Sequence, residues 1–308
     1  MLLPAHQHGT DAQGRDLLAR PDWSAQRVLN LDGYGLTHLP EDRQPSPDSA
    51  ALSVYDNALI ALPDWVWSLR RLRTLNVSAN RLEKLPDGLG ELHDLVMLDV
   101  GHNALNALPD VFTGLGRLEF LYASHNRLGG LPASVRFLRS LRYLNVTDNA
   151  LTGLPEWLGD LGHLSEVRVY GNQLTTLPGG IGALGGLREL HAMNNRLSSL
   201  PDALGDCAAL EVLDLQGNAL TELPETIGRL AALTDLNLRF NVLNSVPESL
   251  CELRSLRTLD LRANALTTVP ESLATLPHLR KLDLRWNAIE RAPDAFDALA
   301  ERGCVIYT

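Results

Sequence analysis

The sequence predicts an α/β solenoid, a stack of similar short turns that each contain one strand and one return segment. An asparagine recurs every 23 residues from Asn57 to Asn287, without an insertion. Two successive 23-residue stretches from Leu256 to Glu301 show the pattern: LRTLDLRANALTTVPESLATLPH and LRKLDLRWNAIERAPDAFDALAE. A repeat this short indicates stacked turns, because one turn cannot bury its own apolar side chains.

Each repeat divides at its asparagine into a strand and a return. The residues before the asparagine, such as LRTLDL, alternate apolar and polar side chains, which is the period of a β-strand. The residues after it, such as LTTVPESLATLPH, place apolar side chains three and four apart behind a proline, which indicates a short helical or irregular segment. Stacked turns then form a parallel sheet. The array is predicted over residues 27–301 as twelve turns, with Tyr34 in place of the first asparagine.

The repeated asparagine is expected to be structural. At the end of each strand the backbone turns toward a dry core, and an amide side chain offers both donors and an acceptor to the exposed backbone groups. The positions are Asn57, Asn80, Asn103, Asn126, Asn149, Asn172, Asn195, Asn218, Asn241, Asn264 and Asn287.

The two ends depart from the pattern, as caps of a solenoid must. Residues 1–26 are predicted to flank the array, with a covering helix from GRDLLARPDWSAQ that faces the first turn through Leu17, Leu18 and Trp23. The first return is predicted to be a loose polar loop, because Arg43 and two serines replace its apolar residues.

The carboxyl-terminal end is predicted to close the array. FDALAERG should form a helix that stops at Gly303, and CVIYT should form a last strand within a cap of residues 302–308.

Composition excludes several functions. The chain has 308 residues and a net charge of −10, which argues against nucleic acid as a partner because binding phosphates needs a basic face. No apolar run approaches the ~20 residues of a membrane span. Phosphate-loop, HExxH and GxSxG motifs are absent, so neither an enzyme nor a cofactor is expected.

The cysteines and the basic residues bear on the source and location of the chain. Three dispersed cysteines without a CxxC pair indicate free thiols in a reducing compartment, and the first residues lack the basic start of a secretory signal peptide. A cytoplasmic protein is therefore expected, with export into a host cell as an alternative. Arginine makes up all but two of the 27 basic residues, which is typical of a GC-rich and hence bacterial genome.

The motif L-x-L-x-x-N-x-L at a 23-residue period resembles the leucine-rich repeat family. Its LPxxLGxLxxL form is similar to the intracellular Ras-group repeats of plants and animals and to many bacterial repeat proteins. The resemblance implies a horseshoe of about twelve turns, with a parallel concave sheet and short helical or irregular convex segments. It also implies that the concave face binds another protein.

Aromatic, methionine and basic side chains gather at strand positions that should face solvent. Met97, Phe120 and Tyr143 fall in one column on three successive turns. Exposed clusters of this composition are typical of interface hot spots. The predicted partner-binding cluster consists of Met97, Phe120, Tyr122, Tyr143, Arg168, Tyr170, His191 and Met193.

A second candidate is a column of arginines flanked by aromatic residues. An aspartate stands two residues before its second and third arginines, which favours a solvated charge ladder over a site for an anionic peptide or acidic surface. Its members are Arg239, Arg262 and Arg285, with Phe240 and Trp286 beside them.

Three residues immediately before successive repeat asparagines, His102, His125 and Asp148, form the third candidate. Two imidazoles and a carboxylate stacked ~5 Å apart could hold a metal or share a proton. A contact rim sensitive to pH is favoured over a metal, because no substrate pocket can be recognised beside them.

The sequence thus predicts non-catalytic recognition of another protein, by a bacterial effector or an intracellular adaptor. A monomer is expected, with a dimer closed by the aromatic cluster as an alternative. The alternative from another class is a metal-dependent hydrolase centred on His102, His125 and Asp148. On the return side, Trp65 and Trp157 are candidates for a second exposed surface.

Overall fold

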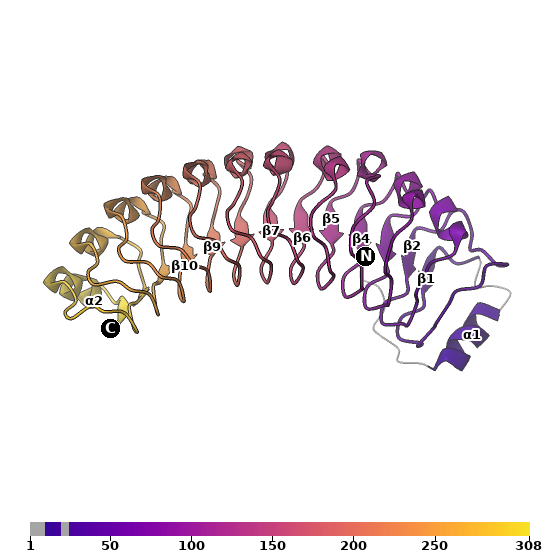
Figure 1. The fold of residues 1–308 in the computed structure, drawn as a ribbon, viewed down its shortest axis with the longest axis horizontal. Helices are drawn as coiled ribbons and strands as arrows, with labels where there is room; N and C mark the ends of the chain where they lie inside the picture. Colours follow the sequence, from indigo (N-terminus) through magenta and orange to yellow (C-terminus); the bar gives the residue numbers. More distant parts are fainter. Residues whose placement is uncertain (1–9, 20–24) are drawn as a thin grey trace. The chain divides into compact units, whose positions relative to one another are not determined.

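A computed structural model describes residues 10–19 and 25–308, and its elements follow the predicted repeat. The chain divides into two compact units, Met1–Ala150 and Leu151–Thr308. In each unit the short strands lie side by side along one side and the short helices along the other (Figure 1). The predicted repeat solenoid is therefore confirmed within each unit, whereas the division into residues 1–26, 27–301 and 302–308 stays a prediction.

The strands of each unit pair in parallel and in chain order. Neighbours are displaced by one repeat, so that Met97 lies beside Phe120 and Phe120 beside Tyr143. In the first unit the strands are β1 (Val28–Asn30), β2 (Ala51–Ser53), β3 (Thr74–Asn76), β4 (Met97–Asp99), β5 (Phe120–Tyr122) and β6 (Tyr143–Asn145). In the second they are β7 (Glu166–Arg168), β8 (Glu189–His191), β9 (Val212–Asp214), β10 (Asp235–Asn237), β11 (Thr258–Asp260), β12 (Lys281–Asp283) and β13 (Val305–Tyr307).

The return segments form short 3-10 helices. In the first unit they are η2 (Asp64–Ser68), η3 (Asp87–Glu91), η4 (Phe112–Gly114) and η5 (Ala133–Phe137). In the second they are η6 (Glu156–Asp160), η7 (Gly179–Ala183), η8 (Asp202–Asp206), η9 (Glu225–Arg229), η10 (Glu248–Glu252), η11 (Glu271–Thr275) and η12 (Asp294–Phe296). A proline precedes most of them, because its fixed φ and missing N–H suit a helix start. None of the described helices has the length and apolar character needed to cross a membrane.

The repeat asparagines join each turn to the one before it. Asn80 accepts the Leu59 backbone N–H through Oδ1 at 3.0 Å. Its Nδ2 donates to the carbonyl oxygens of Val54 in the preceding turn and Val77 in its own turn, at 2.9 and 3.1 Å. Each of the eleven asparagines accepts a hydrogen bond from the backbone N–H 21 residues before it. Their predicted structural role is therefore confirmed.

Glycine in the LPxxLG motif allows the 3-10 helices of the second unit to pack closely. A Cβ on Gly205 in η8 would lie 2.3 Å from the Thr226 carbonyl oxygen of η9. A Cβ on Gly228 would lie 2.4 Å from the Ser249 carbonyl oxygen. Contacts this short exclude any side chain, so these glycines fix the spacing of successive turns.

Helix α1 (Asp11–Ala19) packs on the first turn, as predicted. A Cβ on Gly14 would lie 2.8 Å from the Leu36 side chain. Leu18 is buried, whereas Trp23 and the side chain of Leu17 lie outside the described residues.

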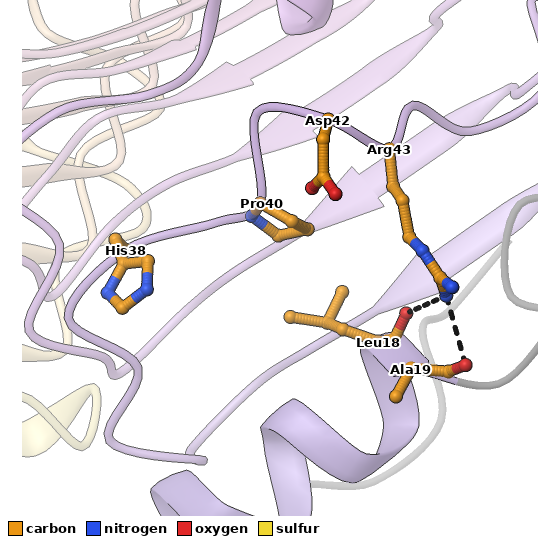
Figure 2. Close-up of a pocket in the computed structure, with 6 residues that line it drawn as sticks. All are labelled: Leu18, Ala19, His38, Pro40, Asp42 and Arg43. Atoms are coloured by element: carbon orange, nitrogen blue, oxygen red, sulfur yellow. Dashed lines mark hydrogen bonds between the residues drawn. The ribbon is translucent and has the colours of Figure 1, made fainter.

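Arg43 anchors the carboxyl end of α1. Its Nη1 donates to the carbonyl oxygens of Leu18 and Ala19 at 3.3 and 3.0 Å. Figure 2 shows these bonds beside a pocket lined by Leu18, Ala19, His38, Pro40, Asp42 and Arg43. The first return has no helix, as predicted, but its arginine caps α1.

The carboxyl-terminal elements also match the prediction. Helix α2 (Asp297–Glu301) ends before Gly303, whose φ of 87° is left-handed. Strand β13 then pairs with β12, with Val305 opposite Lys281. The paired residues are one residue further apart in sequence than the 23-residue repeat, because α2 lengthens the last return segment.

Candidate functional site

We call strand face the first and third strand residues of each turn together with the two residues before its asparagine, the positions that the sequence predicts to face away from the core. The middle residue of each strand from β1 to β12 is buried, whereas the first and third residues of β4 to β9 are half-buried. The predicted alternation is therefore confirmed. All the predicted partner-binding residues lie on the strand face.

The first unit carries an apolar column across three strands. Met97, Phe120 and Tyr143 occupy successive first positions and are half-buried. Tyr122 lies beside them, and its ring centroid is 4.8 Å from that of Tyr143 at a tilt of 38°. The column thus offers a preformed apolar and aromatic surface with two phenol groups.

The second unit places its share of the predicted cluster beside carboxylates. Arg168 Nε donates to Glu166, and His191 Nε2 lies 2.9 Å from Glu189 Oε2. Tyr170 and Met193 are half-buried on the same face. The two glutamates were missed by the sequence interpretation, although they occupy matching first positions in β7 and β8.

Three of these residues, Glu166, Glu189 and His191, form a group in the described part of the chain whose geometry could suit a metal ion. One ligand atom each from Glu166, Glu189 and His191 lies within 4.8 Å of the other two. Carboxylate and imidazole ligands suit zinc. However, Arg168 already bonds to Glu166 and supplies a positive charge to the cluster.

The arginine column forms a partly buried ion network. Arg262 Nη2 lies 2.7 Å from Asp260 Oδ2, and its Nε lies 3.3 Å from Asp283 Oδ2. Arg285 Nη2 lies 2.6 Å from Asp283 Oδ2. The Asp283 side chain is fully buried, so the expectation of a solvated ladder is wrong for the carboxylates.

The charge of Asp283 is maintained in spite of its burial. Burial raises the pKa of this carboxyl, but hydrogen bonds from Arg285 and the charges of Arg262 and Arg285 outweigh burial and leave the pKa below its ordinary value. Arg239, in contrast, donates from Nε to the neutral Gln216 Oε1 at 2.6 Å.

The backbone just before every repeat asparagine is left-handed. The φ angles at these eleven positions lie between 50° and 68°. This region favours glycine and is tolerated by asparagine, aspartate and histidine. The residues are Asp56, Ala79, His102, His125, Asp148, Gly171, Asn194, Gly217, Phe240, Ala263 and Trp286.

The left-handed backbone explains why histidine and aspartate occur at His102, His125 and Asp148, so a metal is not needed to explain these residue types. His102 and His125 stack with ring centroids 4.0 Å apart, and His125 Nε2 lies 3.2 Å from Asp148 Oδ2. Burial, followed by the charge of His125, lowers the pKa of His102. Because left-handed positions select these residue types, the metal-dependent hydrolase is not proposed further.

Phe240 and Trp286 are the large apolar residues at this left-handed position. A left-handed conformation costs a residue with a side chain roughly 1–2 kcal/mol. Phe240 is 48% exposed and Trp286 67% exposed. Their ring centroids are 6.3 Å apart, and Ala263 occupies the turn between them.

The two tryptophans of the return side differ from the expectation. Trp65 is buried, and its Nε1 donates to the Pro40 carbonyl oxygen at 2.8 Å, so its predicted exposure is wrong. Trp157 is half-buried. Packing against the preceding turn covers Trp65.

Comparisons with known proteins agree with this architecture. A leucine-rich repeat protein of Leptospira interrogans is 28% identical over 91% of this chain and 83% of that chain, with a TM-score of 0.63. The ectodomain of the Arabidopsis thaliana receptor kinase GASSHO1/SCHENGEN3 is 28% identical with a TM-score of 0.61. The match covers 89% of this chain but only 40% of that one. No curated protein matches the chain significantly.

A more distant structure and a family model complete the comparison. An internalin of Listeria monocytogenes shares the fold at 17% identity and a TM-score of 0.69, covering 99% of this chain and 98% of that chain. The model for a leucine-rich repeat region matches residues 62–169 and 180–301. Because these segments hold the repeated strands and the asparagine bonds described above, the chain belongs to the leucine-rich repeat family.

Proposed function

We propose that the chain is a non-catalytic recognition scaffold whose strand face binds a protein partner. The observation that carries this proposal is the apolar column of the first unit. Tyr122 and Tyr143 lie in contact, and Met97 and Phe120 extend their surface over neighbouring strands. Short paired strands hold these side chains in place, which lowers the ordering cost of binding.

Related structures support a protein or peptide as the ligand. The GASSHO1/SCHENGEN3 ectodomain is in complex with CASPARIAN STRIP INTEGRITY FACTOR 2. Another neighbour, 29% identical with a TM-score of 0.52, is PEPR1 in complex with AtPEP1. The chain spans less than half of each of these two proteins, so the proposal takes over the class of ligand and not its identity.

The test compares capture of partners by the wild-type chain and by a Tyr122→Glu/Tyr143→Glu variant. Bacterial lysates and plant or animal lysates are used as separate sources. Each captured protein is then purified, and its affinity for both chains is measured by calorimetry. We expect binding to the wild type and a loss of about a hundredfold in the variant, since buried aromatic anchors dominate interface energies.

A Thr74→Glu/Thr258→Glu variant is the matched control, because it adds the same charge at two half-buried strand positions outside the apolar column. It should bind as the wild type does, and circular dichroism should show all three chains folded. Equal binding by the tyrosine variant would contradict the proposed surface. The source of the partner would distinguish an effector that acts in a host from an adaptor inside a bacterium.

Self-association through the same column is the remaining alternative. Sedimentation at two concentrations tests it, because a dimer closed by the column would dissociate on dilution and in the tyrosine variant. We propose a monomer, for which the sedimentation coefficient stays constant.

A further inference from the structure

Two large aromatic side chains of the second unit stand where the repeat favours other residues. All nine of the other left-handed positions before a repeat asparagine hold glycine, asparagine, aspartate, histidine or alanine. At Phe240 and Trp286, φ is 56° and 59°. A bulky residue in this region is a conformational outlier, and such outliers cluster at binding sites.

Stability of the fold does not account for these residues. Trp286 is 67% exposed and Phe240 is 48% exposed, so about two thirds of the tryptophan surface and half of the phenylalanine surface stay in contact with water. Glycine at the matching positions, Gly171 and Gly217, adopts the same backbone without a side chain. A contact with another molecule would account for both the exposure and the strain.

The two rings form one apolar surface. Their centroids are 6.3 Å apart at a tilt of 38°, although their turns are not adjacent. The turn between them contributes only the methyl group of Ala263, so the two rings can approach each other across it. A large apolar side chain of a partner can therefore pack on both rings at once.

The charge next to this surface is positive. Arg262 and Arg285 are neutralised by Asp260 and Asp283. Arg239 precedes Phe240 and bonds to the neutral Gln216, and no carboxylate pairs with it in the part of the chain that the structure describes. The Arg239 guanidinium can therefore pair with a carboxylate of a partner, although the net charge of the whole chain is −10.

Nearby acidic residues, which include Asp214 of the preceding turn, restrict where the partner's carboxylate can lie. Asp235 begins β10, four residues before Arg239 and hence ~13 Å away along the extended chain. Glu290 lines the same hollow as Trp286. Repulsion from Glu290 excludes an acidic group beyond the tryptophan, so the Phe240 side is favoured.

We propose that the strand face around Phe240 and Trp286 binds a peptide segment in which an acidic residue lies close to a large apolar residue. The carboxylate pairs with Arg239, and the apolar side chain packs on the exposed surface that the two rings form together. The inference rests on the proposed function, protein recognition, but concerns a surface separate from the tyrosine column.

The test is selection of random peptides displayed on phage against the wild-type chain. Enriched peptides are synthesised, and their dissociation constants are measured by fluorescence anisotropy with Phe240→Gly, Trp286→Gly and Arg239→Gln. We expect peptides with Asp or Glu near Phe, Trp, Leu or Met. Affinity should fall about tenfold in each glycine variant and several-fold in Arg239→Gln.

Melting temperature is the second measurement, since it separates a binding role from a structural one. The glycine variants should melt at or above the wild-type temperature, because glycine relieves the left-handed strain. Ala79→Gly is the matched control, because it relieves the same strain at a φ of 53° in the first unit. It should bind the peptides as tightly as the wild type does.

Three outcomes would overturn the proposal. The first is that no peptide is enriched, or that the glycine variants bind as tightly as the wild type. The second is a lower melting temperature in the glycine variants, since the rings would then stabilise the fold. The third is loss of peptide binding only in Tyr122→Glu/Tyr143→Glu, which would leave the proposed function standing and place the peptide on the tyrosine column.

Discussion

Asn195 is bonded to Leu174 of the preceding turn, through its Oδ1 and the Leu174 backbone N–H at 3.0 Å. The Nδ2 of Asn195 donates to the carbonyl oxygens of Val169 and Ala192 at 3.0 and 3.1 Å. The side chain is buried, so water cannot replace these partners. One amide therefore satisfies backbone groups of two turns and links them.

Replacing Asn195 by alanine should lower the free energy of unfolding by about 3 kcal/mol, because buried backbone groups lose their partners. Asn195→Asp should lower the free energy of unfolding further at neutral pH. The substitution replaces the Nδ2 donor by a charged oxygen that faces the carbonyl oxygens of Val169 and Ala192. Urea unfolding followed by circular dichroism measures both changes. The exposed Asn106 is the control, and Asn106→Ala should shift the midpoint little. Equal midpoints for Asn195→Ala and Asn106→Ala would contradict the structural role of the asparagine.

The period of the repeat was sufficient to predict the strands, the returns and the asparagine bonds. The backbone before the asparagine was missed, although aspartate, histidine and glycine recur there and signal a left-handed residue. His102, His125 and Asp148 were consequently interpreted as chemistry, when the local backbone already favours them.

Other features of the site depend on side-chain packing that a periodic pattern does not specify. The DLR motif shows that Asp283 and Arg285 are close in sequence. It does not show that Arg262 of the preceding turn contacts the same carboxylate. Burial of Trp65 depends on a carbonyl oxygen of Pro40 in the preceding turn. Such contacts arise from the stacking of turns, and the residues of a single turn do not reveal them.

Gly205→Ala should destabilise the second unit by roughly 1–3 kcal/mol, the usual cost of overpacking. The new Cβ would lie 2.3 Å from the Thr226 carbonyl oxygen, so η8 and η9 would have to move apart. Gly162→Ala is the control, because a Cβ there would meet nothing within 4 Å. Thermal unfolding should show a lower melting temperature for Gly205→Ala only, and equal values would refute the close packing.

Asp283→Asn should cost about 3 kcal/mol at neutral pH, because it leaves two partly buried arginines with one carboxylate between them. Asp294→Asn, which affects an exposed pair with Arg291, should change stability by less than about 1 kcal/mol. Urea unfolding at neutral pH compares the two variants.

The cost of Asp283→Asn should also depend on pH. The pKa of Asp283 is lowered in the folded chain, so its contribution is present above the unfolded pKa of about 4. It is lost as the pH falls through the lower folded pKa. Unfolding in urea at pH values from neutral to strongly acidic should therefore show the difference from wild type shrinking. A difference that stays constant would mean that the charge of Asp283 does not stabilise the fold.

His102 should make the fold less stable as the pH falls below neutral. Burial and the neighbouring His125 lower its pKa, whereas Asp99 and Asp148 act in the opposite direction. Between the folded pKa and the unfolded value of about 6.5, the unfolded chain binds more protons, so the free energy of unfolding decreases with decreasing pH.

His102→Asn should reduce this pH dependence without lowering stability at neutral pH, because asparagine tolerates the left-handed backbone at a φ of 51°. Urea unfolding at several pH values between weakly alkaline and weakly acidic tests the slope. Titration of the His102 ring protons by NMR tests the cause directly. A ring that titrates above the ordinary histidine pKa would contradict the prediction, since the carboxylates of Asp99 and Asp148 would then outweigh burial and the charge of His125.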